Sequence, residues 1–124
     1  MLQEAAHPDA REGLRRGIWA TVHMFAADRD VLRALASMAH LDADAVGGAV
    51  DRMEEGRAIG ARYRAERLAD QDLLRPDVTV EHATSLLWVL TSFDAFYLLY
   101  TGRGLSADSA AEILISAAER AVCR

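Results

Sequence analysis

Only two prolines, Pro8 and Pro76, interrupt this chain of 124 residues. Proline breaks a helix interior because its ring removes a backbone donor and clashes with the preceding turn, so the stretch between the two prolines is open to helix. The chain is also rich in alanine, the strongest helix former. No segment alternates apolar and polar residues for long enough to suggest a strand. We therefore expect an all-α fold, built as a single domain over residues 1–124.

The spacing of the apolar residues predicts about five helices. We expect them over 9–27, 30–40, 43–70, 80–101 and 107–123, with 1–8 as a frayed lead-in and 70–77 as a loop. Side chains suited to helix N-termini stand at or near these boundaries, namely Asp9, Asp28 or Asp30, Asp42 or Asp44, Thr79 and Ser106. Gly102 or Gly104 suits a left-handed end to the fourth helix. Gly47, Gly48, Gly56 and Gly60 predict a bend or a close helix contact in the third.

The last two predicted helices carry more apolar surface than one small domain is expected to bury. The segment 80–101 carries apolar side chains on opposite faces, and those of 107–123 span about half of its circumference. The simplest way to bury this apolar surface is against a second copy of the chain. The last two helices of each subunit would then form an intersubunit four-helix bundle in a homodimer. The alternative is that this surface is covered within one subunit. The predicted interface comprises Ser85, Ser92, Phe96, Leu99, Ala111, Leu114, Ala118 and Val122.

Charge and composition narrow the functional classes. The chain has 14 arginines and no lysine against 19 acidic residues, a net charge of −5. Nucleic-acid binding by this chain alone is not expected, because such binding relies on a cationic surface. The single cysteine, Cys123, fits a reducing compartment. We expect a cytoplasmic protein with no signal peptide and no membrane span, since the apolar stretch 83–100 is short and contains polar residues.

The second half of the chain resembles the C-terminal half of TetR-type transcriptional regulators. The resemblance covers about the last 60 residues and is carried by LLRPDVTVEHA (73–83), LWVLTS (87–92), DAFYLL (94–99) and GRGLSAD (102–108). It implies a helical domain that binds a small effector and dimerises through its last two helices. Members of that family begin with a helix-turn-helix head that enters the DNA major groove. Nothing similar opens this chain, so we expect DNA binding only through a head that is absent here. The arginine-rich, alanine-rich composition suggests a bacterial source.

No catalytic or metal-binding motif is apparent. The sequence has no Gly-x-Ser-x-Gly elbow, no phosphate-binding glycine loop and no His-Glu-x-x-His. The histidines lack ligand spacing. Asp42 and Asp44 faintly resemble a calcium loop, but Met53 stands where the bidentate acid belongs, so a helix cap is the better interpretation. We therefore expect no enzymatic activity, no cofactor and no metal.

An effector pocket among the first four helices is the main site hypothesis. Such pockets combine aromatic and flexible side chains with a few polar anchors. The candidate lining residues are Trp19, His23, Phe25, Met38, Met53, Arg57, Tyr63, Trp88, Phe93, Asp94 and Tyr97. Each of them could instead be an ordinary core residue.

Asp94 is the sharpest single candidate for a polar anchor. It stands among apolar neighbours, where an unpaired carboxylate would be costly to bury. We expect it either to meet Arg57, Arg64 or a polar ligand group inside the domain, or to lie at a solvated edge.

Three functional classes follow. The first is effector sensing and dimerisation in a TetR-type regulator, with a small apolar ligand shifting the domain between two helix arrangements. The second is a stand-alone helical protein–protein interaction module, which a large exposed apolar patch would favour. The third, a small helical enzyme, has no visible nucleophile and base to support it.

Overall fold

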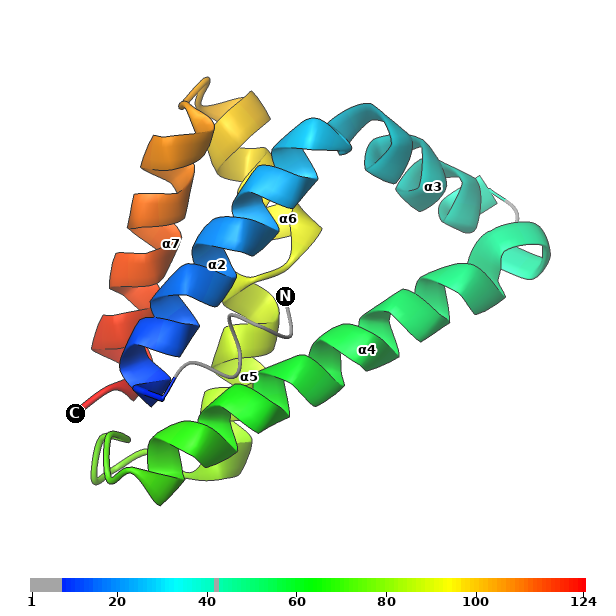
Figure 1. Ribbon diagram of the computed structural model, residues 1–124. Helices are drawn as coiled ribbons and strands as arrows, with labels where there is room; N and C mark the ends of the chain where they lie inside the picture. Colours follow the sequence, from blue (N-terminus) through cyan, green and yellow to red (C-terminus); the bar gives the residue numbers. More distant parts are fainter. Residues whose placement is uncertain (1–7, 42) are drawn as a thin grey trace.

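The fold is all-α, as predicted (Figure 1). The computed structural model describes residues 8–41 and 43–124, and the side chains of all of these except 40 and 43–47. Its helices are α2 (Ala10–Ala27), α3 (Arg29–Leu41), α4 (Ala43–Asp70), α5 (Val80–Leu90), α6 (Phe93–Tyr97) and α7 (Ala107–Val122), with a π-helical turn η1 (Leu98–Gly102) continuing α6. The predicted lead-in falls almost entirely outside the described residues.

Most of the predicted helix ends are confirmed. Asp9, Thr79 and Ser106 are N-caps whose side chains accept hydrogen bonds from the first backbone N–H groups of α2, α5 and α7. Gly104 has a φ of 69°, the left-handed conformation expected near the end of the fourth predicted helix. Asp28 caps the C-terminus of α2 and also directly precedes α3, where its backbone oxygen accepts a hydrogen bond from Leu32 N at 3.0 Å.

The core lies where α2, α5, α6, α7 and the C-terminal part of α4 meet (Figure 1). Its largest fully buried side chains come from all five of these helices and are Leu14, Ile18, Val22, Leu68, Leu87, Phe96 and Val122. Helix α2 contacts α7 along its length, and α4 contacts α5. Small alanines on α4 and α7 allow the helices to approach closely, and the last helix is therefore enclosed on one side by its own subunit.

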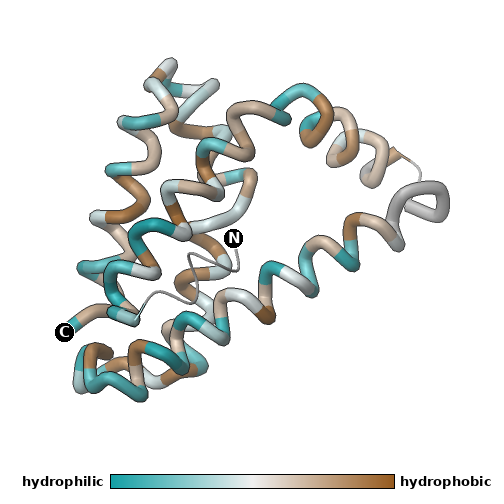
Figure 2. The backbone as a smooth tube through the Cα atoms, in the orientation of Figure 1, coloured by the Kyte–Doolittle hydropathy of each residue, from teal (hydrophilic) through white to brown (hydrophobic). Residues whose placement is uncertain are grey.

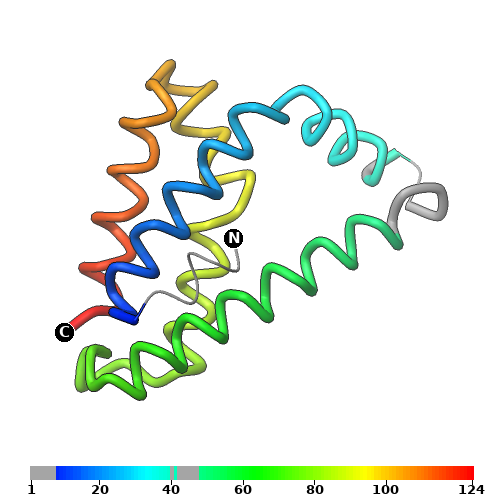
Figure 3. Tube along the Cα trace, in the orientation of Figure 1, coloured from blue at the N-terminus to red at the C-terminus, as the bar shows by residue number. Residues whose placement is uncertain are grey.

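Helix α3 and the N-terminal half of α4 leave this core as a separate helical pair (Figure 3). Among the described residues, none of the buried core side chains comes from positions 29–60. Apolar positions nevertheless recur along both helices of the pair (Figure 2). The bend or close contact expected from the glycines of α4 is wrong for Gly56 and Gly60, because α4 runs unbroken and both glycines face open space.

The predicted helix 80–101 is broken in the structure. Ser92 adopts an extended conformation with ψ of 155°, and its Oγ accepts a hydrogen bond from Ala95 N, so a new helix begins there. The segments on either side, Val80–Leu90 and Phe93–Gly102, meet at 44°. In the described part of the chain no single helix is long and apolar enough to cross a membrane, and this bent pair is the one combination that meets the requirement by length and composition.

Candidate functional site

The predicted dimer interface is mostly buried inside the subunit. Phe96, Ala111, Leu114, Ala118 and Val122 are all core residues with at most 5% of their surface exposed. They contact the subunit's own helices, so the prediction that they meet a second copy is wrong. The break at Ser92 contributes to this error, because it turns Phe96 toward α2 instead of outward. Of the remaining predicted interface residues, Ser85 is exposed, whereas Ser92 and Leu99 are half-buried.

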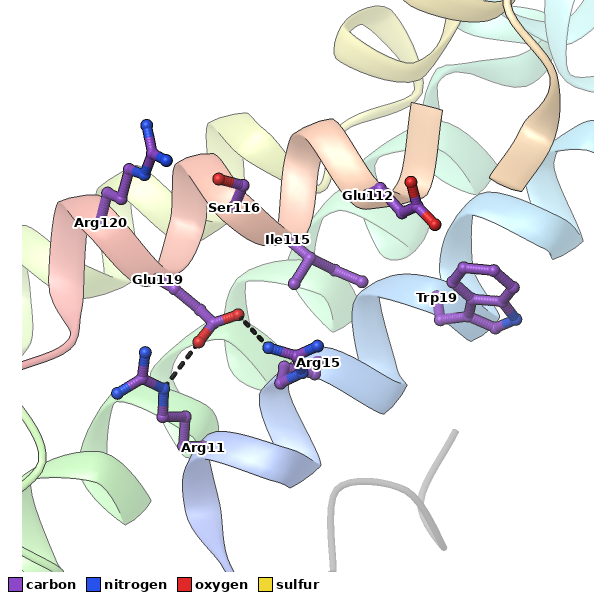
Figure 4. A pocket seen from close by; sticks show the side chains of 8 residues that line it. All are labelled: Arg11, Arg15, Trp19, Glu112, Ile115, Ser116, Glu119 and Arg120. Atoms are coloured by element: carbon purple, nitrogen blue, oxygen red, sulfur yellow. Dashed lines mark hydrogen bonds and ion pairs between the residues drawn. The ribbon is translucent and has the colours of Figure 1, made fainter. Parts of the chain in front are cut away.

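The outward face of α7 carries a different set of residues. Glu112, Ser116 and Arg120 form an exposed row along the helix, four residues apart, with Ile113 beside it at 46% exposure. Shallow hollows flank this row on both sides, and both hollows are lined by its three residues. Figure 4 shows the hollow on the α2 side. In the described part of the chain, neither Glu112 nor Arg120 has an ion-pair partner within the subunit.

Glu119 lies at the other edge of that hollow and is buried. Its carboxylate accepts a hydrogen bond from Arg11 Nε at 2.6 Å and another from Arg15 Nη1 at 2.7 Å (Figure 4). The hydrogen bond and the negative charge of Glu119 raise the pKa of Arg11. In sequence, Glu119 falls with Glu112 and Ser116 in a polar strip that is expected to face solvent. That expectation is wrong for Glu119, because its carboxylate connects α7 to the first turns of α2. With its arginines and glutamates, the hollow of about 530 Å³ is unsuited to an apolar ligand.

The predicted effector-binding residues do not converge on one cavity. Phe25, Phe93 and Tyr97 join Phe96 and Tyr100 in an aromatic cluster, with neighbouring ring centroids 5.0–5.7 Å apart, where α2 meets α6 and η1. This cluster is packed core, so the alternative interpretation holds for these three residues.

The other candidate residues are distributed over separate surfaces. Trp19 and His23 face α7, and Met38, Met53 and Tyr63 are exposed on α3 and α4. Arg57 lies over the ring of Trp88 and donates a hydrogen bond to its carbonyl oxygen at 2.9 Å, which joins the middle of α4 to the end of α5. These positions make Arg57 and Trp88 a helix–helix contact in this structure.

Asp94 lies at a solvated edge, one of the two alternatives considered. It is exposed in the first turn of α6, where a carboxylate interacts favourably with the helix dipole. Arg57 pairs with Glu54 at 2.5 Å, and Arg64 Nη1 donates a hydrogen bond to Gly13 O at 2.8 Å. The hypothesis that Asp94 meets one of these arginines is therefore wrong.

The pair formed by α3 and α4 is attached to the rest of the domain by polar and aromatic contacts. The guanidinium of Arg29 lies 5.8 Å from the ring centroid of Tyr100, and that of Arg33 lies 5.4 Å from that of Tyr97. Cation–π contacts of this kind each contribute on the order of 0.5–1 kcal/mol at exposed sites. Helix α3 is thus held against the aromatic cluster more weakly than α2 is.

Comparison with known proteins gives no assignment. No family model, no curated protein and no solved structure matches the chain. Among the residues that the structure describes, no group of three or more His, Cys, Asp or Glu side chains is placed to hold a metal ion.

Proposed function

We propose that this chain is the effector-sensing and dimerisation domain of a TetR-type regulator. The resemblance lies in residues 73–108, which here form the loop before α5, the broken helix α5–α6–η1 and the turn into α7. DNA recognition is not part of the proposal for these residues, because it belongs to the helix-turn-helix head of such regulators.

The observation that carries the dimerisation part is the self-complementary row on α7. Glu112 and Arg120 lie four residues before and after Ser116. If two copies of α7 cross in antiparallel fashion at Ser116, the two-fold axis brings Glu112 of each copy beside the partner's Arg120. The small side chain at the crossing permits close approach, and Ile113 of one copy then lies next to the partner's Ala117. Two opposite-charge contacts and two apolar contacts follow from one symmetric arrangement.

Effector sensing is supported by the surface of the outlying helical pair. Val31, Met38 and Leu41 on α3 and Met53 and Ile59 on α4 are at least 45% exposed. Methionine side chains adapt readily to apolar ligands of different shape. A small apolar molecule that binds between α2, α3 and α4 would cover such side chains and favour one position of α3 over another. Its effect is limited by the difference between its affinities for the two positions.

Thermal unfolding with added ligands tests this sensing role. The full chain is screened against a panel of small apolar and amphipathic compounds, and a true effector is expected to raise the melting temperature. At a concentration 100 times its dissociation constant, a ligand stabilises the folded state by about 2.7 kcal/mol, a shift of many degrees for a domain of this size.

A matched pair of variants locates the binding region. Met38→Glu is expected to reduce the ligand-induced shift, because it places a charge on the proposed surface. Ser85→Glu, at an exposed position on α5, is expected to leave the shift intact. Indifference to every compound contradicts the sensing role and favours the alternative of a helical interaction module.

A further inference from the structure

His23 joins the C-terminal half of α2 to the first turn of α7. Its Nδ1 lies 2.8 Å from the backbone oxygen of Trp19, and its Nε2 lies 2.8 Å from Oδ1 of Asp108. The Trp19 ring also stacks on the imidazole, with centroids 4.6 Å apart and planes inclined by 29°. These contacts connect two helices through one side chain that titrates near neutral pH.

The chemistry of the two partners sets the charge of the ring. A carbonyl oxygen and an ionised carboxylate can only accept hydrogen bonds. A neutral imidazole has one donor nitrogen and one acceptor nitrogen, so it can satisfy only one of these partners at a time. Both hydrogen bonds form together only when both nitrogens carry a proton. The stacked indole further favours this cation, because the face of an aromatic ring attracts positive charge.

We propose that His23 and Asp108 form a pH-operated clasp, closed when the imidazole is doubly protonated and opened when it loses one proton. On opening, one of the two acceptors loses its donor, and the link between α2 and the start of α7 weakens. This inference is independent of the proposed effector and of dimerisation, because both residues belong to one subunit. It gives the domain a response to pH across the range in which histidine titrates.

The surroundings agree with this assignment. The hydrogen bond to Trp19 O raises the pKa of His23 above its ordinary value of 6.5, and the interaction with the Asp108 carboxylate raises it further. Burial lowers this pKa, but by less than the Trp19 hydrogen bond raises it. Other charged side chains on the elements that contact α2 include Arg29 and Asp30 on α3, Arg57 and Arg64 on α4, Asp94 on α6 and Glu112 on α7. None of these is bonded to the imidazole. Asp108 is therefore the carboxylate on which the clasp depends.

The direction of the pH dependence follows from the raised pKa. The folded chain holds the proton more tightly than the unfolded chain does, so the clasp stabilises the fold fully below about pH 6.5. This contribution is lost as the pH rises through the higher pKa of the folded state. Since the His23 side chain is 36% exposed, solvent screens part of the effect.

Titration of the histidine ring by NMR tests the clasp directly. In the wild-type chain, the resonance that disappears in His23→Gln is expected to titrate above pH 6.5. In Asp108→Asn, the pKa of His23 is expected to fall toward 6.5, because the carboxylate is gone while the Trp19 contact remains. Asp94→Asn, which removes an exposed acid on the neighbouring α6, serves as the control and is expected to leave the pKa unchanged.

Amide hydrogen exchange at the start of α7 reports whether the clasp also opens. After correction for the intrinsic dependence of exchange on pH, protection of residues 109–111 is expected to fall as His23 loses its proton. In His23→Gln the corrected protection is expected to be independent of pH. A His23 pKa that is the same in wild-type and Asp108→Asn chains, or a pH-independent protection in the wild type, overturns the proposal.

Discussion

At Gly17 the missing side chain makes room for a neighbour. The guanidinium of Arg64, from α4, rests against α2 there and donates a hydrogen bond to Gly13 O. A Cβ atom at position 17 would lie 2.0 Å from Arg64 Nη2, so an alanine would displace the guanidinium. The role of Gly17 could not be predicted from the sequence, because the residue that occupies the space beside it is 47 positions away.

Gly17→Ala therefore has opposite effects in two backgrounds. In the wild type, losing a charged hydrogen bond costs about 1.5–3 kcal/mol, and the better helix propensity of alanine returns about 1 kcal/mol. We expect a net loss of about 1 kcal/mol. In an Arg64→Ala background the obstruction is gone, and the same substitution is expected to stabilise the chain by up to about 1 kcal/mol. Urea unfolding of the four chains measures this coupling, and equal effects in both backgrounds would contradict it.

The burial of Glu119 could not be predicted from the spacing of residues along the sequence. The spacing of polar residues on α7 predicts that Glu119 faces solvent together with Glu112 and Ser116. In the structure it is buried, because Arg11 and Arg15 supply donors from α2. An arginine pair four residues apart near the start of a helix is a possible signal for such a partner. The partner itself is more than 100 residues away and could not be identified without the fold.

At the scale of elements, helix ends were easier to predict than helix continuity. Asp9, Thr79 and Ser106 cap helices through local hydrogen bonds, so the residues nearby are enough to identify them. The interruption at Ser92 is different. A serine inside an apolar run is compatible with either an unbroken helix or a new N-cap, and here the tertiary fit of Phe96 into the core coincides with the second outcome.

The outlying pair of helices is expected to open before the rest of the domain. Since no described side chain between positions 29 and 60 is part of the buried core, local unfolding there exposes little additional apolar surface. We expect amides of α3 to exchange with solvent at least tenfold faster than those in the middle of α2, α5 and α7 under conditions that favour the native state. Hydrogen exchange followed by mass spectrometry makes the comparison. Equal protection in α3 and α2 would contradict this account of the core.

At the scale of the whole molecule, the all-α class and most helix boundaries could be predicted from sequence, because they depend on local periodicity and capping. The arrangement of the candidate pocket residues could not be predicted from sequence. Phe25, Phe93 and Tyr97 belong to a packed cluster around Phe96, whereas the other candidates lie on separate surfaces: Arg57 contacts Trp88, and Asp94 is exposed. Whether an aromatic side chain lines a cavity or fills the core depends on helix positions that the spacing of residues does not contain.

The predicted dimer interface was also wrong because it depended on helix positions that the sequence does not show, and the structure suggests a different interface. An excess of apolar surface on the last two helices indicated a partner, but much of that surface is covered by α2 and α4. The large apolar side chains that remain exposed there are Trp88, Val89 and Leu98 on the broken helix and Ile113 on α7. The row of Glu112, Ser116 and Arg120 replaces the buried residues as the proposed site of contact between subunits.

The mass of the chain in solution tests this contact most directly. By sedimentation equilibrium at micromolar concentration we expect twice the 13.6 kDa of the single chain. Glu112→Arg and Arg120→Glu, each of which places like charges opposite one another, are expected to shift the equilibrium toward the monomer, and combining them is expected to restore the dimer. Glu55→Arg, an exposed reversal on α4, controls for the change in net charge. A wild-type mass of 13.6 kDa, or a dimer that neither single reversal weakens, would contradict the account.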